Sequence, residues 1–243
     1  MEKLLTYGDW LNEEMMSVDW KEADHVEWEK LHMENINMLR DVLSKHKTRW
    51  WVDCGTLLGI HRDGGIISGD SDTDLGILAE DINPDVINDM SKGWDNSNAM
   101  FYNQKDVLKY CEDDNYYAIK NIKWAGLRNK NNTITKFKGK EVWADLFIYF
   151  PYKNDRFYKF ADGYFRTHGN YLNTFTTFTH KGVSLKKPKM VEKYLEDIYG
   201  KGWKTPNPEY SAVDANIYGG PITSKDIGGT YKWNFVKQDY KIV

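Results

Sequence analysis

Two aspartates, Asp72 and Asp74, stand two positions apart in a segment that is typical of a β-strand. Side chains alternate along a strand, so both carboxylates leave the same face, while Leu75 and Ile77 give the other face to a core. Two carboxylates this close repel each other unless a cation lies between them. The pair predicts a site for a hard divalent ion such as Mg²⁺, which proteins hold through one or two carboxylates together with substrate phosphates.

A third carboxylate, Asp145, lies in the otherwise apolar segment 142–149. A bare carboxylate buried there would cost several kcal/mol unless it were paired or bound to a metal. If its strand is next to that of Asp72 and Asp74, three carboxylates converge, which suits metal-assisted phosphoryl or nucleotidyl transfer with a base. The alternative is an ion pair between Asp145 and a buried Lys or Arg.

The segment before these acids has the residue types of an anion site. A strand candidate over 49–53 runs into Gly55 and Thr56 and then into a helical segment. Glycine lets a phosphate approach the backbone closely, and free N–H groups at the start of a helix favour an anion. Gly55 and Thr56 are therefore phosphate-binding candidates, although the same pair after a strand is commonplace. Arg62 either serves as a fork of donors to phosphate or is a plain surface residue.

A calcium loop is a competing interpretation of the acids. Asp70, Asp72 and Asp74 match positions 1, 3 and 5 of an EF-hand loop. Position 6, which should be glycine, is Leu75, and position 12, which should be glutamate, is Asp81. These departures, and the strand-like sequence after Asp74, argue against an EF-hand.

Helical and extended segments are expected to position these residues. Helical spacing predicts helices over 20–44 and 189–199, the second ending at Gly200, and one that begins at Pro84. Strands are expected at 49–53, 72–78, 116–122, 133–137, 141–150 and 183–185, with a turn at 138–140. The segment 205–243 is rich in Pro, Gly and polar residues and is expected to be irregular. This order predicts a small α/β or α+β domain.

Composition narrows the class of protein. With 41% hydrophobic and 15% aromatic residues among 243, the chain is expected to fold and to be soluble. It has no apolar run of the roughly 20 residues that cross a bilayer, and its N-terminus lacks the pattern of a signal peptide. Cys54 and Cys111 are its only cysteines, which excludes a disulfide scaffold and a cysteine-rich zinc site and favours a cytoplasmic location.

Charge is unevenly distributed along the chain. The net charge of −3 does not favour a nucleic-acid partner. Residues 1–100 have 9 Lys and Arg against 21 Asp and Glu, whereas residues 101–243 have 24 against 15. This asymmetry fits either a carboxylate site that holds a cation and faces basic phosphate-binding groups, or two ordinary solvated surfaces.

Four ordered sequence boxes resemble the LicD/fukutin family of the nucleotidyltransferase-fold superfamily. They are Gly55–Gly59 with Arg62, Ile67–Asp74, Asp145–Phe147, and Tyr199–Trp203 with Pro206. The likeness covers about residues 28–206, and it departs from the family pattern at Ser68-Gly69, in place of Pro-Trp, and at Ser71. The long N-terminal membrane anchor of the Golgi members is not seen, so the sequence looks closer to the bacterial-type branch.

The resemblance implies an α+β, nucleotidyltransferase-like fold in which helices flank a small mixed sheet. It implies a catalytic domain over 1–206, with a core of about 28–206, and an irregular C-terminal extension over 207–243 that packs on the core. The surplus aromatic residues either fill that core or form a face for a sugar or a choline cation.

The same resemblance implies a transferase that uses a CDP-linked donor, CDP-choline or a CDP-polyol such as CDP-ribitol. It would move phosphocholine or the polyol phosphate to a hydroxyl of a glycan or glycolipid and release CMP. Asp72 and Asp74 would hold Mg²⁺ or Mn²⁺, and Asp145 would share a metal or accept the proton of the hydroxyl. Asp70 is a weaker candidate for a metal ligand.

Carried over in the same way, Gly55 and Thr56 would contact the donor phosphate, and Arg62 would add a charge-assisted hydrogen bond. Two alternatives stay open from the sequence. The first is a nucleotidyltransferase that adds NMP to a small acceptor through the same three acids. The second is a non-catalytic nucleotide- or glycan-binding module on the same fold.

Overall fold

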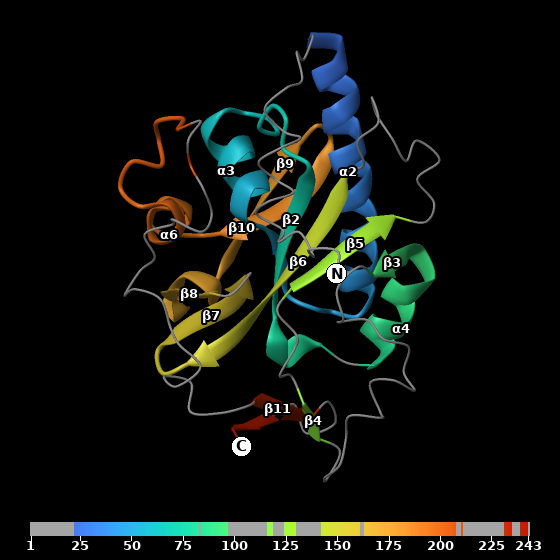
Figure 1. The fold of residues 1–243 in the computed structure, drawn as a ribbon, viewed down its shortest axis with the longest axis vertical. Coiled ribbons are helices and arrows are strands. Elements are labelled where there is room, and N and C mark those ends of the chain that lie inside the picture. Colours follow the sequence, from blue (N-terminus) through green and yellow to red (C-terminus); the bar gives the residue numbers. More distant parts are fainter. Residues whose placement is uncertain are drawn as a thin grey trace, which may run out of the picture.

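A mixed β-sheet runs through the centre of the molecule (Figure 1). The computed structural model describes residues 22–82, 84–96, 116–118, 124–129, 142–160, 163–207, 210, 231–234 and 239–242. Strands lie side by side in the order β1-β2-β6-β5-β3, and β7 and β8 continue the sheet from β6. Their bounds are Trp50–Val52 (β1), Asp72–Leu78 (β2), Trp94–Asn96 (β3), Trp124–Asn129 (β5), Trp143–Tyr152 (β6), Asp155–Phe160 (β7) and Gly163–His168 (β8).

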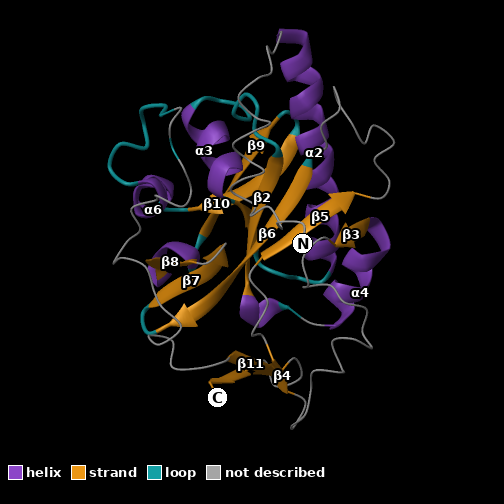
Figure 2. Cartoon of the chain, in the orientation of Figure 1, coloured by secondary structure: helices purple, strands orange, loops and turns teal. Residues whose placement is uncertain are grey.

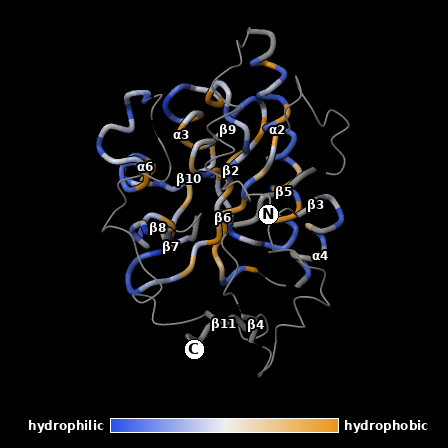
Figure 3. The backbone as a smooth tube through the Cα atoms, viewed as in Figure 1, coloured by the Kyte–Doolittle hydropathy of each residue, from blue (hydrophilic) through white to orange (hydrophobic). Residues whose placement is uncertain are grey.

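The middle of this sheet is the parallel pair β2 and β6, whereas the other described pairs of the sheet are antiparallel. Both strands are buried along almost their whole length. Continuous burial is typical of strands that are covered on both faces. In Figure 3, hydrophobic segments gather on the central strands, and the outer loops are hydrophilic.

Helices and a hairpin surround the sheet (Figure 2). The helices are α2 (Glu22–Lys45), α3 (Cys54–Arg62), α4 (Pro84–Gly93) and α6 (Val191–Tyr199), with short 3-10 turns at Ala79–Asp81 and Gly169–Leu172. Thr73 of β2 hydrogen-bonds His32 of α2, and the next residue, Asp74, hydrogen-bonds Thr56 of α3. Since neighbouring residues on a strand point to opposite faces, α2 and α3 cover opposite faces of β2.

Two smaller sheets complete the described chain. Strands β9 (Phe175–His180) and β10 (Val183–Pro188) form an antiparallel hairpin. Strand β11 (Tyr231–Asn234) pairs with both β4 (Tyr116–Ala118) and β12 (Asp239–Ile242). Strands β11 and β12 fall within 205–243, where the sequence predicts irregular chain, so that expectation is wrong for these eight positions. The domain boundary at 206 stays a prediction.

The aromatic residues of the described chain mostly fill the core. The largest fully buried side chains include Trp28, Trp50, Trp51, Tyr149 and Tyr194. Rings also pack against one another: Trp51 stacks on Phe175 with ring centres 5.1 Å apart. For these residues packing accounts for the aromatic side chains, since it buries a large apolar area in favourable ring geometry. A face for a sugar or a choline cation stays a prediction.

The α+β class with a small mixed sheet flanked by helices is confirmed. Segment 72–78 is β2 with the predicted bounds, and the predicted helices correspond to α2, α4 and α6. Predicted strands 49–53, 141–150 and 183–185 correspond to β1, β6 and β10. Strands β3, β5, β7, β8 and β9 were not predicted. The predicted strand 133–137 and the turn 138–140 lie outside the described residues, as does Cys111.

Gly76 of β2 is required by close packing against the neighbouring strand. It pairs with Trp51 of β1, and a Cβ at this position would meet the Trp51 ring and would lie 2.7 Å from Asp53 Oδ2. Gly76→Ala should therefore lower the free energy of unfolding by about 1–3 kcal/mol, the usual effect of overpacking. Urea denaturation measures this change.

Gly202→Ala is the control, because a Cβ at Gly202 meets nothing within 4 Å. Its stability should stay within about 0.5 kcal/mol of wild type, as for most surface substitutions. Equal stability of Gly76→Ala and wild type would show that the Trp51 ring moves aside without cost.

Candidate functional site

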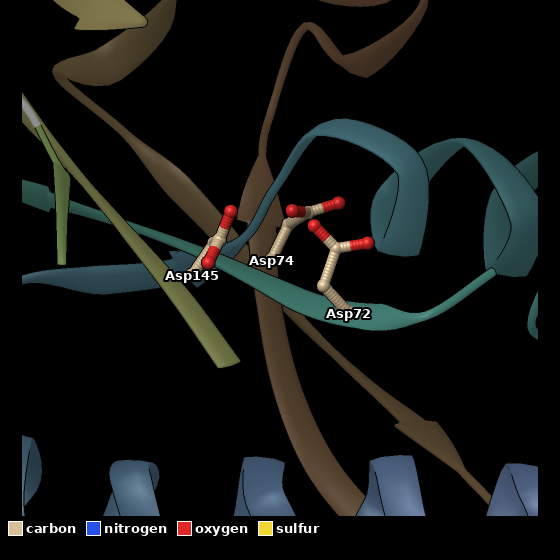
Figure 4. Close-up of side chains that lie close together, drawn as sticks. All are labelled: Asp72, Asp74 and Asp145. Carbon is tan, nitrogen blue, oxygen red and sulfur yellow. The ribbon is translucent and has the colours of Figure 1, made fainter. Parts of the chain in front are cut away.

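Three carboxylates meet on the parallel pair at the centre of the sheet (Figure 4). The register of β2 and β6 puts Asp74 directly beside Asp145, and Asp72 lies two residues earlier on the same face. One oxygen from each of Asp72, Asp74 and Asp145 lies within 4.8 Å of the other two. The expected convergence of the three acids is confirmed as geometry, and their roles in metal binding and catalysis stay predictions.

Burial makes this cluster costly without a cation. Asp74 is 5% exposed and Asp145 is 2% exposed. Burial raises the pKa of both carboxyl groups well above its usual range, and the charge of Asp72 raises each pKa further. In the part of the chain that the structure describes, Asp145 Oδ2 is buried and accepts no hydrogen bond.

The donor set therefore fits a hard divalent cation. Carboxylate oxygens are the protein ligands that Mg²⁺ and Mn²⁺ favour. A cation at this point would offset the mutual repulsion of the acids and would satisfy the buried oxygen of Asp145. An ion pair, the alternative expected for Asp145, is not formed with any described Lys or Arg.

Gly55 brings the start of α3 against two of the acids. A Cβ on Gly55 would lie 2.9 Å from Asp70 Oδ2 and 3.1 Å from Asp74 Oδ2. Any side chain at this position would therefore press on the carboxylates. The same distances place the carboxylate of Asp70 beside that of Asp74, and burial together with the charges of Asp72 and Asp74 raises the pKa of Asp70. Asp70 thus lies at the edge of the cluster.

Thr56 holds Asp74 at two points. Its backbone N–H donates to Asp74 Oδ2 at 3.1 Å, and its hydroxyl accepts from the Asp74 backbone N–H at 2.8 Å. Thr56 is fully buried. In this structure Thr56 positions a carboxylate, and its predicted contact with a donor phosphate stays a prediction.

Arg62 lies at the other end of α3. Its Nε and Nη2 donate to the Asp63 carboxylate at 2.8 and 2.7 Å, and its Nη1 donates to the Trp203 carbonyl at 3.3 Å. Seven residues separate it from Gly55, which corresponds to about 10 Å along a helix axis. The structure therefore does not bring Arg62 together with the carboxylates, and its predicted contact with phosphate stays a prediction.

Helix α2 supports the site from the opposite face, through two residues that were not predicted to contact it. Trp28 Nε1 donates to the carbonyl of Asp70 at 2.6 Å, and His32 Nε2 lies 3.1 Å from the same oxygen. A carbonyl only accepts, so Nε2 carries the proton, and His32 Nδ1 accepts from the Thr73 hydroxyl at 2.9 Å. The helix thus fixes both the loop before Asp72 and the residue between the two acids.

His32 is held in its neutral form. It is fully buried, and burial lowers its pKa to about 4. In the unfolded chain the histidine takes up a proton near pH 6.5, so between pH 6.5 and 4 only the unfolded state is protonated. The contribution of neutral His32 to stability is therefore complete above this window and is lost as the pH falls through it.

His32→Gln should flatten the acid side of the stability profile. Glutamine retains a donor for the Asp70 carbonyl but does not titrate. The difference between wild type and variant should change by about 3 kcal/mol between pH 6.5 and 4, with wild type losing more stability. Urea denaturation at stepped pH values measures it, and parallel profiles would contradict the neutral assignment.

Asp53 begins α3 and was also not singled out. Its carboxylate accepts from the Cys54 backbone N–H at 2.9 Å, and its carbonyl accepts from Leu57 N–H at 2.8 Å. An aspartate directly before a helical segment is an N-cap signal, which could have identified it from the sequence. Cys54 follows with φ 39°, in the left-handed region that non-glycine residues rarely adopt. Burial raises the pKa of its thiol, so it is not an activated nucleophile.

Comparison with known proteins decides the family. A family model described as LicD/FKTN/FKRP, nucleotidyltransferase domain, matches residues 47–190, more than half of the chain. The chain belongs to the LicD/fukutin family. The match contains Gly55, Thr56, Arg62 and the three clustered acids, whereas α2 and α6 lie wholly outside it. LicD/fukutin proteins include transferases of phosphate-containing groups.

Individual relatives match more narrowly. The mouse ribitol-5-phosphate transferase FKTN is 25% identical over 201 residues, which cover 78% of this chain and 36% of that protein. Two uncharacterized proteins, RP689 of Rickettsia prowazekii and RT0683 of Rickettsia typhi, are each 46% identical over 41 residues, or 17% of this chain. Those matches cover 15% and 13% of the two rickettsial proteins. The chain thus aligns with well under half the length of each of these relatives.

None of the described helices is both long enough and apolar enough to span a bilayer.

Proposed function

We propose that this LicD/fukutin protein transfers a phosphate-containing group from a CDP-linked donor to a hydroxyl of a glycan or glycolipid and releases CMP. The group is phosphocholine or a polyol phosphate such as ribitol phosphate. The observation that supports this most directly is the cluster of three carboxylates within 4.8 Å, with an unsatisfied buried oxygen on Asp145. The mouse relative named ribitol-5-phosphate transferase supports the class of group.

The carboxylates of Asp72, Asp74 and Asp145 would hold Mg²⁺ or Mn²⁺, with Asp70 beside them. A divalent cation supplies charge neutralisation for the donor diphosphate and for the leaving CMP. Gly55 and Thr56, at the start of α3 next to the carboxylates, are the proposed contacts of the donor phosphate. Arg62 would add a contact to the donor phosphate by releasing the Asp63 carboxylate, to which its guanidinium donates in this structure.

In the proposed reaction, the oxygen of the acceptor hydroxyl attacks the phosphorus that bears the choline or polyol. The bond from this phosphorus to the bridging oxygen breaks, and the bridging oxygen leaves with CMP. The hydroxyl proton passes to a carboxylate, and Asp145 Oδ2 is the proposed acceptor because it is buried and accepts no hydrogen bond from the described atoms. Asp145 serves either in this way or as a third ligand to the metal.

A second candidate is nucleotidyl transfer, which is favoured by the match to a nucleotidyltransferase domain. The same three acids would serve, but attack at the other phosphorus of the donor would move NMP to the acceptor. The mass added to the acceptor separates the two reactions.

We also propose a cytoplasmic location, which rests on the presence of only two cysteines in the sequence.

Activity is tested with CDP-choline, CDP-ribitol and CDP-glycerol, each with Mg²⁺ and glycan extracts, by measuring CMP release. At least one donor should give turnover, and Asp72→Ala should lower it by a hundredfold or more, since metal stabilisation supplies several kcal/mol. Asp41→Asn is a matched control on the exposed face of α2, with Asp41 paired to Arg40. If no donor is bound in the presence of metal, the donor assignment fails.

Asp145→Asn gives a second test that does not need the substrate. Removing one of three neighbouring like charges should raise the stability of the metal-free protein, because mutual repulsion is reduced. In wild type, Mn²⁺ at a hundred times its Kd should add about 2.7 kcal/mol to the free energy of unfolding, and in the variant it should add much less. Thermal unfolding with EDTA or Mn²⁺ measures both. A variant that is less stable without metal and equally stabilised by Mn²⁺ would contradict the metal site.

A further inference from the structure

A second buried polar cluster lies at the start of α3. Tyr149 donates its hydroxyl proton to Asp53 Oδ2 at 2.7 Å, Tyr194 donates to Asp53 Oδ1 at 2.5 Å, and the two hydroxyl oxygens are 2.7 Å apart. All three residues are fully buried. We call Asp53, Tyr149 and Tyr194 the Asp53 cluster.

The Asp53 cluster joins three elements that are distant in sequence. Asp53 is the N-cap of α3, Tyr149 lies on β6 four residues after Asp145, and Tyr194 lies on α6. Trp51 Nε1 of β1 also donates to the Tyr194 hydroxyl at 3.4 Å. A buried carboxylate is costly unless it accepts hydrogen bonds. Asp53 accepts three, from the Tyr149 and Tyr194 hydroxyls and from the Cys54 backbone N–H.

The same residue reaches the metal site through the backbone. Asp53 N–H donates to the Asp74 carbonyl at 3.0 Å, and the turn that Asp53 caps contains Thr56, whose N–H donates to the Asp74 carboxylate. The backbone N–H and the hydroxyl of Thr56 each form a hydrogen bond with Asp74. The position of Asp74 therefore depends on the first turn of α3.

The backbone of that turn is strained at Cys54. Cys54 has φ 39°, which costs of the order of 1 kcal/mol or more for a non-glycine residue and persists only where surrounding contacts impose it. Gly55, next in the chain, adds backbone freedom. The contacts that impose the conformation are the bonds of the Asp53 carboxylate to Cys54, Tyr149 and Tyr194.

We propose that Asp53, Tyr149 and Tyr194 are positioning residues, which fix the first turn of α3 and, through Thr56, set the place of Asp74 in the metal site. The metal part of this inference rests on the proposed function, and the part that concerns the turn does not. Tyr194 lies beyond the residues that match the family model, so α6 contributes to the site from outside the matched segment.

The test uses Tyr149→Phe and Tyr194→Phe, which remove one hydroxyl each and retain the ring. Hydrogen exchange of the amides of residues 54–57 should speed up at least tenfold in each variant, while exchange in the buried part of α2 stays at the wild-type rate. The affinity for Mn²⁺, followed by electron paramagnetic resonance, should fall about tenfold or more, as for other supports of metal ligands. Tyr152→Phe, on the same strand as Tyr149 and half-buried, should change neither readout.

Wild-type exchange over 54–57 in both variants would overturn the inference, and so would local loosening with unchanged Mn²⁺ affinity. A uniform rise of exchange in α2, α3 and α6 would show a purely structural role and would overturn it as well. If the wild-type protein binds no Mn²⁺, the proposed function fails, and the exchange data alone decide the role of the cluster. Should a Phe variant not fold, Asp53→Asn, which retains a capping side chain, is measured in the same way.

Discussion

Mutual repulsion among buried carboxylates is the constraint on which the site depends. The parallel register of β2 and β6 places Asp74 beside Asp145, and strand alternation adds Asp72 on the same face. Three like charges within 4.8 Å at the buried centre of a sheet destabilise the protein unless a cation or protons offset them. This local cost in stability is an observation that the proposed metal site would account for.

The surrounding structure resists this repulsion from both faces of the sheet. On one face, His32 and Trp28 of α2 hold the loop before Asp72, and His32 is kept neutral so that Thr73 can donate to it. On the other face, Thr56 of α3 holds Asp74 by two hydrogen bonds. The backbone on either side of Asp72 and the carboxylate of Asp74 are thus held by helices, the kind of support that a precise metal site requires.

Family membership and geometry support different parts of the functional proposal. The LicD/fukutin match supports the proposed class of chemistry, and the carboxylate cluster supports the proposed place of the reaction. The uneven charge of the sequence gains a partial explanation, because Asp145 comes from the basic part of the chain and completes a site begun by Asp72 and Asp74 in the acidic part. The predicted role of Arg62 gains no support from the geometry, since its described partners are Asp63 and the Trp203 carbonyl.

The sequence by itself determined the strand 72–78, the helices, the acid pair and the family, because each depends on local periodicity or on residues close together in the chain. It did not predict β5, β7, β8 and β9, whose pairing and packing partners, and not local pattern, decide their extended state. Only the tertiary structure decided that Asp145 lies beside Asp74, that Thr56 grips a carboxylate, and that Tyr149 and Tyr194 enclose Asp53. These contacts join residues 18 to 141 positions apart, and register between distant strands is not written in either strand alone.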